Sequence, residues 1–120
     1  MAETDVFDSG ALTHMSPTQD QFISMRTIPS KPIKAADNMI FHANAMGNMC
    51  ISIPNGERTS HVVLKDVLYC PDLAFTLVSL SRCDLASYLA LLKDQQCHIC
   101  NSQGTTVGQV PILGSLYKVT

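Results

Sequence analysis

The feature that most constrains the fold is the Asn55-Gly56 pair, which lies between two runs that are typical of strands. Residues 49–53 alternate with the period of two that half-buried strands show, and residues 60–64, which run on to residues 67–69, are expected to form the second strand. Asn-Gly readily adopts the left-handed backbone conformations that a tight hairpin turn requires. The pair therefore predicts an antiparallel hairpin of fixed register in the middle of the chain.

Other runs predict that most of the chain is extended. A second hairpin is expected within residues 33–45, turning at Asp37-Asn38, because both residues tolerate positive φ. Residues 16–32 hold three prolines and are expected to form an irregular surface loop. Further strands are expected toward the end of the sequence, at residues 88–92, 96–100, 105–110 and 116–119.

One short helix is expected after residue 79. Apolar residues at positions 77, 80, 83 and 86 recur with a spacing of three, which suits a helix over residues 80–87 with one buried face. A chain of 120 residues, 46% of them hydrophobic, has the size of a single domain with one core. The sequence therefore predicts an all-β domain over residues 1–120 that contains one short helix.

Charge and hydropathy argue against two classes of partner. The net charge is -2, and the 8 lysines and arginines are scattered, so no basic stripe is available to neutralise phosphates. The longest apolar stretch, residues 85–92, is far shorter than the roughly 20 residues that cross a bilayer. We therefore expect a soluble, cytoplasmic chain that binds neither nucleic acid nor membranes.

The five cysteines are expected to be reduced, because their number is odd and their spacing is not that of a disulfide scaffold. Cys97 and Cys100 have the spacing of half a zinc site. A strand over these residues would place the two thiols on opposite faces, and no second pair of ligands follows. We expect small strand residues here and no metal or cofactor.

The tetrapeptide Asp8-Ser9-Gly10-Ala11 follows the apolar pair Val6-Phe7 and is the strongest candidate for chemistry. A glycine allows close backbone approach, and its N–H can hydrogen-bond a carboxylate held in a tight loop. Alone, so short a motif is a weak signal, and the rest of the chain has to decide its meaning.

At this point the sequence resembles the retropepsin-type protease segment of Ty1/copia-class retrotransposon Gag-Pol polyproteins. Residues 6–15 follow that family's apolar pair and D-S-G-A-(S/T)-x-H-M, except at Leu12. Residues 63–73 resemble its L-x-D-V-L-Y-V-P-x-L, and residues 77–81 its N-L-L-S-V-S. Residues 97–99 and 114–117 resemble its C-x-I and G-x-L-Y. The matching segments occur in order along about nine tenths of the chain.

The resemblance implies a closed, retropepsin-like barrel that is active as a homodimer. Each protomer would supply one aspartate, and the two carboxylates would share a proton and activate a water that attacks a peptide bond of the polyprotein. The implied catalytic residues are Asp8, Ser9 and Gly10, with Ser9 bracing the two loops. The implied substrate-binding residues are Ala11 and a flap around Asp37, Asn38 and Met39. Particle-associated maturation of Gag-Pol is the implied setting.

The sequence departs from the family in several places. Ser79 stands where retroviral relatives have glycine, and the flap candidate has no glycine beside Asp37-Asn38. Only seven residues precede Asp8, where retroviral proteases have a strand and a hairpin. We therefore expect the hairpin over residues 96–110 to fill that place, as in a permuted barrel. His14 is expected to have a structural hydrogen-bonding role.

Two other functions remain open. A retroelement-derived barrel could persist as a catalytically silent dimerisation module, although such a module has no physical need for a costly pair of apposed carboxylates. A generic β-domain that binds a peptide along a sheet edge is the weaker alternative.

Overall fold

The computed structural model describes residues 5–8, 11–34, 39–85, 88–113 and 116–119. Almost all of the regular structure is extended. In chain order, the elements are β1 (Asp5–Asp8), β2 (Met15–Ser16), η1 (Gln19–Gln21), β3 (Arg26–Lys34), β4 (Ile40–Asn55), β5 (Arg58–Tyr69), β6 (Thr76–Ser79), α1 (Leu80–Leu85), β7 (Leu89–Lys93), β8 (Gln96–Cys100), β9 (Thr106–Leu113) and β10 (Leu116–Val119).

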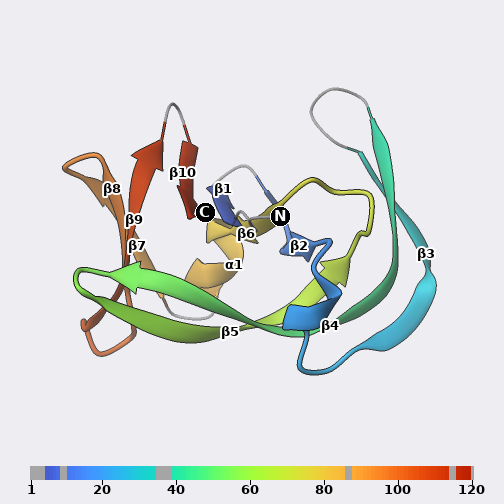
Figure 1. Ribbon diagram of the computed structural model, residues 1–120, viewed down its shortest axis with the longest axis horizontal. Helices are drawn as coiled ribbons and strands as arrows, with labels where there is room; N and C mark the ends of the chain where they lie inside the picture. Colours follow the sequence, from blue (N-terminus) through green and yellow to red (C-terminus); the bar gives the residue numbers. More distant parts are fainter. Residues whose placement is uncertain (1–4, 9–10, 35–38, 86–87, 114–115, 120) are drawn as a thin grey trace.

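The strands form one curled sheet in the order β3-β4-β5-β2-β6-β1-β10-β9-β8-β7. Figure 1 shows the sheet as a half-barrel, with β3 at one side, β7 to β9 at the other, and β1 and β6 between them. Within the described ranges β3 and β7 end the order, so hydrogen bonding does not close the sheet. The prediction of an all-β barrel is confirmed in this coarser form, but the expected closure is not found.

The long hairpin β4–β5 is built as its sequence predicts. Asn55 pairs with Arg58 across the turn, and Gly56 has a φ of +65°. Alternate β4 side chains, among them Met49, Ile51 and Ile53, are buried. Strand β5 ends at the predicted residue 69, and β4 joins the predicted strand over residues 49–53 to the second strand of the hairpin predicted at residues 33–45.

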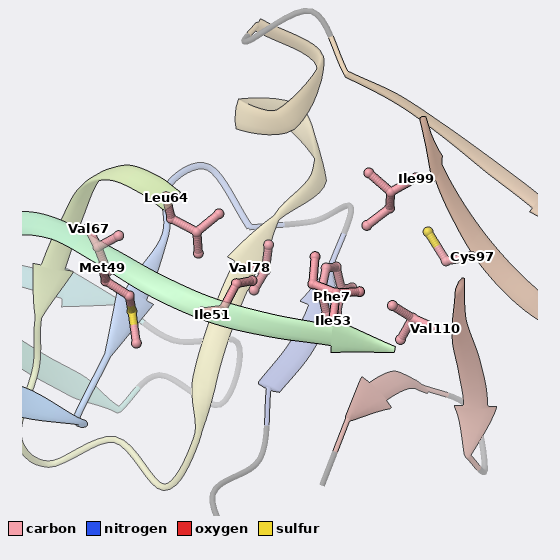
Figure 2. Packing of buried hydrophobic residues seen from close by; sticks show 10 residues of the cluster. All are labelled: Phe7, Met49, Ile51, Ile53, Leu64, Val67, Val78, Cys97, Ile99 and Val110. Carbon is pink, nitrogen blue, oxygen red and sulfur yellow. The ribbon is translucent and has the colours of Figure 1, made fainter. Parts of the chain in front are cut away.

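The main core lies where this hairpin meets the central strands and the C-terminal hairpin. Figure 2 shows side chains from β1, β4, β5, β6, β8 and β9 converging on one region. The buried members of this cluster are Phe7, Met49, Ile51, Ile53, Leu64, Val67, Val78, Cys97, Ile99 and Val110.

The sequence-based prediction of a loop over residues 16–32 is wrong for its second half. Residues 26–32 belong to β3, which pairs with β4 with a register shift between Thr27 and Lys31. Strand β3 lies at the edge of the sheet, where prolines cost no ladder hydrogen bond on the open side. The predicted hairpin at residues 33–45 is confirmed by the β3–β4 pairing, whose tip, residues 35–38, lies outside the described residues.

The C-terminal strands take a place close to the one expected for residues 96–110. Strand β10 pairs antiparallel with β1, followed outward by β9 and β8. The hairpin β8–β9 is thus one strand removed from β1, yet Cys97, Ile99 and Val110 pack in the same core as Phe7. The place beside β1 is therefore taken by β10 and not by the expected hairpin, and the permuted barrel stays a prediction.

Gly47 gives a direct test of the packing in β4. A Cβ at this position would overlap the backbone carbonyl of Ser24, whereas a Cβ at Gly56 would meet open space. We expect Gly56→Ala to lower the free energy of unfolding by about 1–2 kcal/mol, the cost of a left-handed alanine. Gly47→Ala should cost clearly more, because backbone has to move. Urea denaturation of both variants checks this, and equal losses would contradict the close approach.

Candidate functional site

Asp8 lies at the carboxyl end of β1, in the middle of the half-barrel. Strand β1 runs parallel to β6, and Asp8 is in register with Ser79. The preceding Val6 and Phe7 are buried, whereas Asp8 is half-buried. The strand therefore carries this carboxylate from the core toward the surface. Ser9 and Gly10, which the sequence assigns to the same site, lie outside the described residues.

The chain after Asp8 is tied to β6 by buried hydrogen bonds. The backbone N–H of Ser79 donates to Nδ1 of His14 at 2.9 Å. The Ser79 hydroxyl donates to the carbonyl oxygen of Ala11 at 2.7 Å. All three residues are buried. We call Ala11, His14 and Ser79 the loop anchor, because they fix the far end of the loop that begins at Asp8.

Ser79 also caps the helix. Its hydroxyl oxygen accepts the backbone N–H of Arg82 at 3.2 Å, as an N-cap side chain does. The Arg82 side chain reaches back, and its Nε donates to the carbonyl oxygen of Leu12 at 3.4 Å. The start of α1 and the loop after Asp8 are therefore one hydrogen-bonded unit.

Burial sets the charge state of His14. Desolvation, followed by the positive charge of Arg82, lowers the pKa of His14 to about 4 from its usual 6.5. The imidazole is therefore neutral at pH 7, with its proton on Nε2, since Nδ1 accepts a hydrogen bond. The predicted structural role of His14 is confirmed.

A second polar contact, which the sequence did not predict, links the neighbouring strands. The hydroxyls of Ser16 and Thr76 lie 2.7 Å apart, and both residues are fully buried. Ser16 also accepts the backbone N–H of Thr18 at 3.1 Å. A hydroxyl within an apolar segment is expected to be buried and therefore to need a hydrogen-bond partner. The sequence alone does not show that Ser16 and Thr76 are each other's partner.

The β3–β4 hairpin projects as an arm from the half-barrel (Figure 1). Of its predicted substrate-binding residues, Asp37 and Asn38 lie outside the described residues. Met39 is described and is 55% exposed, next to an exposed Ile40. A small cluster around Ala43, Leu68 and Cys70 packs along the arm. Met49, unlike the exposed Met39, is buried in the main core.

The cysteines do not form a metal site in the described part of the chain. Strand β8 alternates, so Cys97 is buried while Cys100 is half-buried. Burial raises the pKa of Cys97 to about 11. No three His, Cys, Asp or Glu side chains among the described residues come together as possible ligands. Nor does any described helix have the length and apolarity to cross a membrane.

The arrangement can be compared with known families. The family model for the Pol polyprotein, beta-barrel domain, matches residues 6–88. The chain belongs to this family. No curated protein and no solved structure matches the chain. The part of this Pol β-barrel domain that matches runs from β1 through α1, and so contains Asp8 and the whole loop anchor.

The titration of His14 predicts a loss of stability in mild acid. The pKa of His14 is lower in the folded Pol β-barrel domain than in the unfolded chain, so the unfolded chain binds the extra proton first. The contribution is complete above pH 6.5 and is lost as the pH falls toward 4, by at most about 3 kcal/mol. Urea denaturation at pH 7 and pH 4.5 measures the loss.

His14→Asn is the matched control for this titration. Its side-chain oxygen can accept the Ser79 N–H but does not titrate. The pH dependence between 6.5 and 4.5 should therefore be shallower in this variant than in the wild type. An identical dependence would show that another group is responsible.

Because the Ser79 hydroxyl makes two hydrogen bonds, its removal should destabilise the folded chain more than the removal of an exposed serine hydroxyl does. Ser79→Ala removes both the helix cap and the bond to Ala11, and should lower the free energy of unfolding by about 1–3 kcal/mol. Ser81→Ala, at an exposed position of the same helix, should change it by less than about 0.5 kcal/mol. Thermal or urea denaturation measures the free energy of unfolding of both variants. Similar losses would contradict the assignment of Ser79 as both helix cap and partner of Ala11.

Proposed function

We propose that this Pol β-barrel domain is one protomer of a homodimeric aspartic endopeptidase, in which Asp8 of each copy supplies one catalytic carboxylate. The observation that carries the proposal is the position of Asp8. It is a half-buried carboxylate at the end of a buried central strand, and the chain beyond it is fixed by buried hydrogen bonds. A reacting group needs this kind of rigid support.

The proposed chemistry requires two copies. Two carboxylates a few ångströms apart share a proton, because both cannot ionise easily. The ionised member takes a proton from water as the water attacks the scissile carbonyl carbon. The protonated member polarises the carbonyl oxygen. Ser9 and Gly10 are assigned here from the sequence resemblance, as the loop residues that brace the two aspartates.

The β3–β4 arm is the proposed flap over the substrate. It is a long hairpin that reaches beyond the main core, and the exposed apolar residues Met39 and Ile40 lie next to its tip. A peptide held beneath it in extended form would be bound through its backbone, with side chains in alternating pockets. Ala11, Asp37 and Asn38 complete the proposed substrate-binding set. The natural substrate would be the polyprotein, within its particle in the cytoplasm.

The decisive variant is Asp8→Asn. It removes the acid–base group and keeps the shape, so cleavage should fall by at least 100-fold, within the range that a general acid–base group contributes. Purified chain is incubated near pH 5.5 with a peptide library made from a digested proteome, and products are identified by mass spectrometry. A statine-containing peptide should block the wild-type reaction.

Asp94→Asn is the matched control. Asp94 is an exposed carboxylate in the turn between β7 and β8. Cleavage by this variant should equal that of the wild type. Equal cleavage by the Asp8→Asn and wild-type chains would reject the aspartic mechanism. A folded dimer without any cleavage would favour the silent dimerisation module.

A further inference from the structure

A cavity of about 470 Å³ lies beside β1, where Phe7, the residue before Asp8, forms part of its lining. Its walls come from β1, β4, β5, β6, α1 and β8, and Asp8 does not line it. Most of the lining is apolar and belongs to the main core or packs against it, including Ile51, Leu64, Val78, Cys83 and Ile99. Figure 2 shows four of these residues, Ile51, Leu64, Val78 and Ile99, around the space below α1.

The inner wall of the cavity carries no charge near neutral pH. Burial raises the pKa of Cys83 above its usual value, so its thiol stays protonated. His14 also lines the cavity and is neutral at pH 7, because its pKa is about 4. The interior therefore offers apolar contacts with few polar partners for water.

The remaining charged lining residues are Lys65, Asp66 and Arg82. Asp66 faces Arg26, which lies outside the lining, at 3.7 Å, so its charge is balanced there. Across the described ranges, neither Lys65 nor Arg82 takes part in an ion pair. Lys65 is exposed and Arg82 is half-buried, as expected of residues at an opening. The charge balance therefore favours an anion.

We propose that this cavity binds an aliphatic carboxylate, with its hydrocarbon chain inside and its carboxylate at Lys65 and Arg82. The volume suits such a ligand, since at about 30 Å³ per water-sized group it holds roughly 15 groups. Apolar chain removed from water supplies the affinity, and the cations select the anionic end. A ligand that fills unoccupied apolar volume also stabilises the folded chain.

Decanoate is the probe, used below its micelle concentration with the full chain at pH 7. Decanol has the same hydrocarbon chain without the charge, and decyltrimethylammonium reverses the charge. Titration calorimetry should give a dissociation constant at least tenfold lower for decanoate than for either control. Methyl resonances of Ile51, Val78 and Ile99 should shift on binding. Equal affinity for decanol, or no methyl shift, would overturn the proposal.

Two kinds of variant test the two ends of the site. Lys65→Gln should weaken decanoate binding at least threefold and leave decanol binding unchanged, whereas Lys93→Gln, on the exposed β7, should change neither. Val62→Phe fills the cavity from a half-buried position and should abolish the methyl shifts. Cys83→Phe is the second filling variant, should the first fail to fold.

Other results would also overturn the assignment. If neither Val62→Phe nor Cys83→Phe weakens decanoate binding, the ligand binds outside this cavity. If Lys65→Gln does not weaken it, the carboxylate does not lie at Lys65. Association with phosphatidylglycerol vesicles in the absence of decanoate binding would indicate a lipid surface in place of a cavity ligand. Asp8→Asn should leave the decanoate affinity unchanged, so failure of the protease proposal is distinguishable from failure of this one.

Discussion

The hydrogen bond from the Ser79 backbone to the His14 imidazole joins the parts of the structure that matter most. It is buried, so no water can replace it cheaply. Through Ser79 it connects the loop after Asp8 to the first turn of α1, and the same serine holds the Ala11 carbonyl. The carboxylate at the end of β1 is thus supported by a residue about seventy positions away in the sequence.

The long β4–β5 hairpin gives the half-barrel two regions with different character. Between Gly47 and Met49 the register shifts, and Asp66 takes a positive φ of 56° on the facing strand. Toward the turn, the hairpin packs in the main core; toward its other end, it joins the β3–β4 arm and a smaller cluster. The bulge lets one hairpin serve both.

Much of this arrangement follows from the sequence alone. Alternation and the Asn55-Gly56 turn fixed the central hairpin, and the spacing of three located α1 within two residues of its observed end. Strands β8 and β10 begin and end at the predicted residues. These elements are governed by local preferences, which a single sequence records directly.

The rest depends on contacts between distant segments. The prolines of residues 26–34 argue against a strand in the sequence, because proline is tolerated in a sheet mainly at its edge. Only the sheet order shows that β3 lies at an edge. Strand β2 has two residues and exists only because β5 and β6 flank it. The roles of Ser79 and Thr76 require partners sixty or more residues away. The open half-barrel and the cavity below α1 likewise depend on the path of the whole sheet.

Membership of the Pol β-barrel family agrees with the retroelement origin inferred from the sequence motifs. The central proposal is that two copies of the chain share one pair of aspartates. Mixing wild-type and Asp8→Asn chains tests this proposal most directly, at a concentration where sedimentation shows only dimers. If both copies contribute to one site, adding an equal amount of variant should lower the cleavage rate by about half, because mixed dimers are inactive. An unchanged rate would mean that one chain suffices, and would contradict the account.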